Sequence, residues 1–226
     1  MPHHLKLLDL THPLSSKNPT YEGTCGFNLS ISLDYKDCKA PNLFRVNRTE
    51  GKAGVGTHMD APAHCFPKGK TIDELDLEDL VTDCAVIDVS KESGQNYLAM
   101  PDAVLQFERE HGHISPNTFV IFYTGWDKFW NTPKKYRAEL KAPGVHVDTA
   151  KLLLKRNIAG IGIDTLSADA GAVDFQVHRI VLGAGKYLVE NIANAKKLPA
   201  TGAKSLVLPI KIEDGTEAPI RLIALI

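Results

Sequence analysis

Three short apolar runs limit the folds that this chain of 226 residues can adopt. They are CAVIDVS at 84–90, TFVIFYT at 118–124 and IAGIGID at 158–164. Each run has too few polar residues to leave one face of a strand in water, so each is expected to be buried on both faces. Strands of that kind lie in the middle of a sheet that helices cover. We therefore predict an α/β protein with these runs as central strands.

Helical sequences lie between the apolar runs, as an α/β fold requires. Residues 100–112 place Pro101 where a first helical turn tolerates it, and residues 148–157 begin at Asp148, which is a capping residue type. Further strands are expected at 5–11, 205–212 and 219–226. The segment 13–56 is rich in Gly, Pro, Asn, Ser and Thr, and we predict hairpins and loops there.

Composition and charge argue against several classes of protein. With 43% hydrophobic residues, 23% charged residues and a net charge of −1, the chain has no excess of positive charge to bind nucleic acid or an anionic membrane. We find no apolar run long enough to span a bilayer, no signal-peptide pattern and no cysteine spacing typical of a disulfide scaffold. We expect one domain, residues 1–226, in the cytoplasm.

The segment GVGTHMDAPAH, residues 54–64, concentrates residues that bind metals. His58 and Asp60 are two apart, so in an extended chain they share a face with Cα atoms about 6.6 Å apart and can converge on one ion. His64 would lie about 20 Å from His58 in a straight strand, so the chain must bend after Asp60, where Pro62 restricts the backbone. A carboxylate between two imidazoles can bridge two ions. The alternative is a loop whose histidines are merely solvated or packed.

The same segment resembles the signature of the cyclase-like metal-dependent hydrolases, the family of bacterial kynurenine formamidase and isatin hydrolase. Other blocks follow in the order expected for that family: LLDLTHPLS, VIDVS, YTGW, GIDTLSAD, VHRIVLGAGKYLVENI and TEAPIRLIAL. The resemblance implies a single domain of the swivelling β/β/α type, with a mixed sheet and flanking helices. It also implies a homodimer or homotetramer.

The resemblance further implies roles for five residues. His58 and Asp60 match ligands of a first metal ion, while Asp60, His64 and Glu190 match ligands of a second. His178 matches a catalytic histidine that is not a ligand. Because an imidazole can take up and release a proton near neutral pH, we predict His64 and His178 as the catalytic residues. The implied cofactor is a divalent metal, zinc or manganese, with one or two ions per subunit.

The chain departs from the family signature at one position. The usual motif is H-x-G-T-H-x-D-x-P-x-H, and its first histidine falls on Gly54, which offers no side-chain ligand. Catalytic zinc sites normally hold three protein ligands and a water, so the first ion lacks one. Three alternatives stay open: a ligand from elsewhere, such as His12 or Cys65, a single ion held by the second set of ligands, or no metal.

From these features we predict a hydrolase that acts on a small molecule. It would cleave an amide, formamide or cyclic amide C–N bond through a metal-activated water. The alternatives are a non-catalytic ligand-binding member of the family with a degenerate metal site, and a metal-dependent lyase or cyclase. Four aromatic residues are candidates for the pocket wall: Phe27, Phe66, Trp126 and Trp130.

Overall fold

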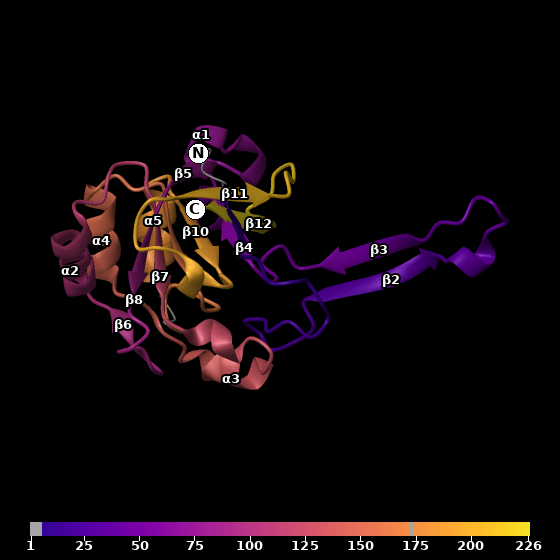
Figure 1. Cartoon of the computed structure of the whole chain (residues 1–226), viewed down its shortest axis with the longest axis horizontal. Coiled ribbons are helices and arrows are strands. Elements are labelled where there is room, and N and C mark those ends of the chain that lie inside the picture. The colour runs from indigo at the N-terminus through magenta and orange to yellow at the C-terminus, as the bar shows by residue number, and fades with distance from the viewer. Residues whose placement is uncertain (1–5, 172–173) are drawn as a thin grey trace.

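Eight strands form one mixed sheet in the body of the molecule (Figure 1). The computed structural model describes residues 6–171 and 174–226. The strand order is β1-β12-β11-β5-β7-β9-β10-β4, and pairing of β12 with β4 closes a barrel-like ring. These strands are β1 (Leu7–Asp9), β4 (His58–Asp60), β5 (Val81–Asp88), β7 (Phe119–Tyr123), β9 (Gly160–Ile163), β10 (Tyr187–Glu190), β11 (Ala203–Pro209) and β12 (Glu217–Leu225). Two short strands, β6 (Leu98–Ala99) and β8 (Gly144–Val145), pair separately.

The three apolar runs form the parallel strands β5, β7 and β9 in the middle of this sheet. Alternate residues of β7 face opposite ways: Phe119 and Ile121 belong to the apolar cluster that holds Met59, while Val120 and Phe122 belong to the cluster shared with the helices. Burial on both faces is thereby confirmed. The strands expected near both chain ends are also present, although residue 5 of the predicted strand 5–11 lies outside the described residues.

Helices α2 (Pro101–His111), α4 (Val147–Lys155) and α5 (Gln176–Gly183) pack against one face of the sheet (Figure 1). The first two confirm the predicted helices. The predicted cap at Asp148 is wrong, because α4 begins one residue earlier and the His146 side chain accepts a hydrogen bond from the Asp148 amide at 3.2 Å. The remaining helices, α1 (Leu77–Leu80) and α3 (Pro133–Arg137), are short.

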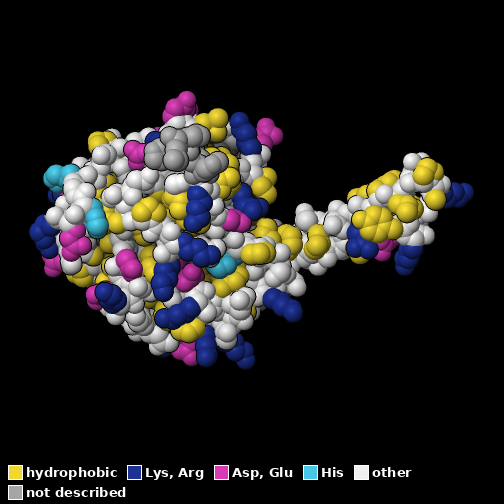
Figure 2. Space-filling view, viewed as in Figure 1, with side chains coloured by type: hydrophobic (Ala, Val, Ile, Leu, Met, Phe, Trp, Pro, Cys, Tyr) yellow, Lys and Arg dark blue, Asp and Glu magenta, His cyan; other side chains and the backbone are white. Residues whose placement is uncertain are grey.

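A two-stranded arm extends from the body of the molecule (Figure 1). It consists of β2 (Phe27–Leu33) and β3 (Val46–Gly51), which pair with each other in antiparallel fashion and confirm a hairpin within 13–56. Apolar side chains cover the outer half of the arm (Figure 2), and they include Leu29, Ile31, Tyr35, Leu43, Phe44 and Val46. In the single chain these side chains are exposed to solvent.

All four cysteines are free thiols, which agrees with the absence of a predicted disulfide scaffold. Among the helices of the described residues, none is long and apolar enough to cross a bilayer. Placement in the cytoplasm stays a prediction.

Candidate metal centre

Strand β4 carries the centre of the site because it lies between β10 and β12. His58 is opposite Glu190 on β10, and Asp60 is opposite Glu217 on β12. Side chains directly opposite each other on neighbouring strands point to the same face of a sheet. Met59, between His58 and Asp60, points to the other face and is fully buried in the core. The shared face of His58 and Asp60 is therefore confirmed, and two glutamates from adjacent strands join them.

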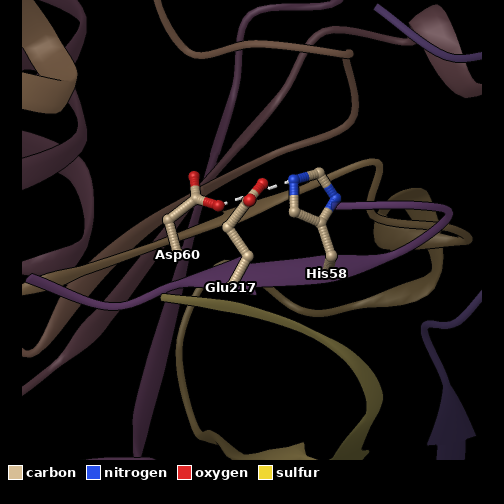
Figure 3. A group of neighbouring side chains, drawn as sticks. All are labelled: His58, Asp60 and Glu217. Atoms are coloured by element: carbon tan, nitrogen blue, oxygen red, sulfur yellow. Dashed lines mark ion pairs between the residues drawn. The ribbon is translucent and has the colours of Figure 1, made fainter. Parts of the chain in front are cut away.

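Two groups of possible ligand atoms meet at Asp60. In the first, single ligand atoms of His58, Asp60 and Glu217 all lie within 4.8 Å of one another (Figure 3). In the second, the same holds for Asp60, His178 and Glu190. Asp60 Oδ1 is 3.6 Å from His58 Nε2, and Asp60 Oδ2 is 3.4 Å from His178 Nε2. A carboxylate between two imidazoles is what the sequence predicts, but His178 of α5 stands in the place expected for His64.

Hydrogen bonds orient both imidazoles toward the carboxylates. His58 Nδ1 donates to the Gly56 carbonyl at 3.0 Å, and His178 Nδ1 donates to Asp169 Oδ2 at 2.5 Å. Asp169 is itself fixed, because it accepts hydrogen bonds from the backbone amides of Val177 and His178 at 2.7 and 3.0 Å. With Nδ1 occupied in this way, Nε2 of each ring is left to face Asp60 and Glu190. Metal-binding histidines are held by such contacts.

The charges around the site are those of a cation-binding centre. Burial acts to lower the pKa of His58, but the carboxylates of Asp60 and Glu190 outweigh it and raise that pKa. Burial likewise acts against the charged form of His178, yet its hydrogen bond to Asp169 and the nearby carboxylates raise its pKa well above the usual value. The pKa of Asp60 is lowered, because the adjacent imidazoles outweigh the effect of its burial.

One carboxylate oxygen of Asp60 has no hydrogen-bond donor among the described residues. Asp60 is 1% exposed, and the oxygen concerned is Oδ1, whose neighbour His58 Nε2 is 3.6 Å away. Leaving a buried carboxylate oxygen unpaired is costly. A divalent cation bound among His58, Asp60 and Glu217 would satisfy this oxygen, and the donor set of imidazole nitrogen and carboxylate oxygens suits such an ion. The residues present therefore fit a metal.

The chain bends after Asp60 as predicted, through a short 3₁₀ turn at Pro62–His64. The turn leaves the His64 side chain 33% exposed, with Nδ1 3.6 Å from Glu217 Oε2. The His64 and His178 rings are 6.2 Å apart between centroids. Among the described residues, His64 belongs to neither ligand group. Its role as a ligand and the catalytic roles of His64 and His178 stay predictions, and the geometry favours His178 over His64 as a ligand.

Neither candidate substitute ligand belongs to the two groups of described residues. His12 stacks on Trp130 with ring centroids 3.8 Å apart, and burial lowers its pKa to about 4. Burial raises the pKa of the Cys65 thiol, which disfavours the thiolate that binds metals. The third member of the first group is instead Glu217, which sequence reasoning missed. Only the pairing of β12 with β4 brings it to Asp60, and no local pattern reveals that register.

A cavity of about 540 Å³ opens above the ligand groups. Its lining includes the two aromatic side chains Tyr21 and Phe175, whose rings are 6.0 Å apart between centroids. None of the four aromatic candidates, Phe27, Phe66, Trp126 and Trp130, belongs to the described lining of this cavity. For the two tryptophans the alternative of plain core packing is confirmed, because they pack with Tyr136 in a separate apolar cluster.

Comparison with known proteins supplies the family context. Residues 8–170 match the model of the cyclase family, which is described as "Putative cyclase". Isatin hydrolase of Roseibium aggregatum is 35% identical over 190 residues, or 76% of this chain and 71% of that protein. Kynurenine formamidase of Bacillus cereus is 24% identical over 225 residues, or 96% and 95%. A solved isatin hydrolase with the product analogue thioisatinate has a TM-score of 0.90 at 28% identity over 98% and 92% of the two chains, which confirms the cyclase-like fold.

Proposed function

Because the chain belongs to the cyclase family, we propose that it is a metal-dependent hydrolase that cleaves the C–N bond of an amide. The observation that carries this proposal is the position of Asp60. Its two oxygens face two buried imidazoles, and Oδ1 accepts no hydrogen bond from the described residues. The relatives named above are hydrolases, which fits a site built to hold a cation beside a cavity.

We propose a cyclic amide fused to an aromatic ring as the substrate class. The relative with the higher identity is named for isatin, which is such a compound, whereas the formamidase relatives are less similar. The cavity suits a flat ring, because Tyr21 and Phe175 offer aromatic faces beside the ligand groups. Aryl formamides are the second class of substrate to test, since their carbonyl carbon would lie beside the same ligand groups.

The metal would be zinc or manganese, with two ions per chain. His58 and Asp60 would contribute to holding one ion, and Asp60, His178 and Glu190 would hold the other. A divalent cation polarises a carbonyl oxygen and makes a water molecule more acidic at neutral pH. Glu190 is positioned for its role by the Ala168 amide, which donates to Glu190 Oε1 at 2.9 Å. Asp169 plays the corresponding part for His178.

His64 is placed to move the proton that hydrolysis requires. The reaction adds OH to the carbonyl carbon and H to the leaving nitrogen, so a proton must pass from water to that nitrogen. His64 lines the cavity beside both groups and is partly exposed. An imidazole in that position can accept the proton from water and donate it to the nitrogen as the C–N bond breaks.

We also propose that the arm joins this chain to a second copy of itself. Strands β2 and β3 pair only with each other among the described residues, so both outer edges of the hairpin are open. The exposed apolar side chains on the arm form the kind of surface that oligomers bury. A homodimer or homotetramer, as the family resemblance implies, would cover them.

Turnover assays test the proposed function directly. Purified protein supplied with manganese or zinc is mixed with isatin or with an aryl formamide, and ring opening or deformylation is followed by absorbance. We expect turnover that a chelator abolishes and added metal restores, with isatin as the better substrate. Binding of these compounds without turnover would favour a non-catalytic binding protein instead. Turnover that survives complete removal of metal would refute the metal-dependent mechanism.

A further inference from the structure

The glycine that replaces the first histidine of the motif lies beside the carboxylate of Glu217. A Cβ atom at Gly54 would stand 2.3 Å from Glu217 Oε1 and 3.4 Å from His58 Nε2. The first of these contacts is far shorter than any non-bonded approach of carbon and oxygen. A side chain at position 54 would therefore require the Glu217 carboxylate to turn away from the place that it occupies here. The glycine leaves room for the carboxylate.

The backbone holds Glu217 at this point. Glu217 is the first residue of β12 and is paired with Asp60 on β4. The Ala61 amide donates to the Thr216 carbonyl at 2.9 Å, and the Ile220 amide donates to the Thr57 carbonyl at 3.1 Å. These hydrogen bonds bracket Glu217 and fix its side chain on the face that carries His58 and Asp60 (Figure 3). Its position thus follows from the sheet and not from a flexible loop.

Two carboxylates directly opposite each other on neighbouring strands repel. Asp60 and Glu217 have this arrangement, and both are removed from bulk water: Asp60 is buried and Glu217 is half-buried. The imidazole of His58 is the nearest positive partner of Asp60 Oδ1, and its Nε2 is also close to Glu190 Oε2, at 3.5 Å. The His58 imidazole thus lies near the carboxylates of Asp60, Glu190 and Glu217. A bound cation would reduce the repulsion between these carboxylates.

We propose that Glu217 is the metal ligand that replaces the missing histidine, so that the first ion is held by His58, Asp60 and Glu217. The inference rests on the proposed function and specifies how its first metal site is completed. Gly54 and Glu217 are sterically complementary: position 54 has no side chain, and the carboxylate of Glu217 from β12 occupies the space beside it. The ligand set becomes one nitrogen and two carboxylates.

This exchange alters the chemistry of the first ion. Carboxylate ligands suit manganese and magnesium, whereas imidazole suits zinc and copper. Replacing an imidazole by a carboxylate therefore shifts the preference of the first site from zinc toward manganese. The second oxygen of Glu217 faces His64 Nδ1 at 3.6 Å, so the new ligand also connects the metal site to the proposed proton carrier.

Metal titration without substrate tests the inference. Wild type, Glu217→Gln and the double variant Gly54→His with Glu217→Ala are titrated with manganese and with zinc by calorimetry. Glu213→Gln removes an exposed carboxylate four residues away and serves as the control. We expect two ions per chain in wild type and in the control. In Glu217→Gln the first ion should bind at least about tenfold more weakly, the smallest loss typical when a contact supporting a metal ligand is removed.

The double variant completes the test, because it returns a histidine to position 54 and removes the carboxylate that would clash with it. We expect it to regain the first ion with a preference moved toward zinc. Glu217→Gln binding both ions as tightly as wild type would overturn the inference while leaving the proposed function intact. The inference would also be overturned if the double variant had the melting temperature of wild type but did not bind the first ion. Wild type that binds no ion would overturn both.

Discussion

The residues of the site differ in their burial, and the difference matches the roles that we propose for them. Asp60, His58, His178 and Glu190 are all buried, and each faces another member of the group. His64 differs because a third of its side chain is exposed, and its Nδ1 lies 3.6 Å from Glu217 Oε2. The buried residues can thus bind an ion away from water, whereas the partly exposed His64 can exchange protons with water.

Replacing His64 tests that separation. We expect His64→Ala to lower turnover by about 10²–10⁴, the usual contribution of a general acid or base, without changing the number of bound ions. Metal content and turnover are measured on the same samples. His111→Ala, on α2 and far from the cavity, should leave both unchanged. Loss of one ion from His64→Ala would contradict this prediction. It would indicate that His64 is a metal ligand, as the family resemblance implies.

Secondary-structure elements position these residues, and the sequence predicts some elements far better than others. Short apolar runs such as 118–124 predict buried strands because the pattern of hydrophobic residues lies within the run itself. The bend at Pro62–His64 is predictable for a similar reason, since proline restricts its own backbone. Glu217 and His178 reach the site only through strand pairing and helix packing, which involve residues distant in the sequence. Family resemblance assigns a role to His178. It covers Glu217 within the block TEAPIRLIAL but assigns that residue no role, and no local pattern does so.

The arm is a two-stranded hairpin without a packed face, and such hairpins are only marginally stable in water. Contact with a second chain would stabilise it. We expect Leu29→Ser with Phe44→Ser to reduce the mass of the particle in solution to that of one chain. Light scattering measures this mass. Leu77→Ser with Ile210→Ser changes two apolar residues that are equally exposed but lie off the arm, and should leave the mass unchanged. A wild type that is already monomeric would disprove the proposed oligomer.

Helices α2 and α4 are joined by an ion pair that makes stability depend on pH. Arg156 Nε and Nη2 donate to the two oxygens of Glu108 at 2.8 and 2.9 Å, and this contact lowers the pKa of Glu108 from 4.5 to about 2. A lowered carboxyl pKa contributes stability above pH 4.5 that is lost as the pH falls toward 2.

We therefore expect Glu108→Gln to lower the free energy of unfolding by about 1 kcal/mol at pH 7. The difference from wild type should shrink as the medium is acidified, and urea denaturation at several pH values measures it. Asp148→Asn breaks an exposed pair with Lys151 and should have almost no effect. A difference that stays constant or grows toward acid pH would be inconsistent with the ion pair as its cause.

The whole molecule combines a closed sheet, a helical layer and a cavity over one point where three strands meet. β10, β4 and β12 each contribute a ligand candidate because the ring closes between β12 and β4. The α/β class and mixed sheet follow from the sequence. Closure of the ring does not, since it depends on pairing of the three-residue strand β4 with β12, which has no local signal. The site therefore exists only in the assembled fold.

Asp60 belongs to both ligand groups, and we propose that the binding of both metal ions depends on it. This dependence is tested most directly by counting the ions that remain on wild type and on Asp60→Asn after loading with manganese or zinc and dialysis. The asparagine has the same shape but lacks the charge shared by both ligand groups. We expect two ions per chain in wild type and loss of both in Asp60→Asn. Equal metal content in the two proteins, or none in wild type, would contradict it.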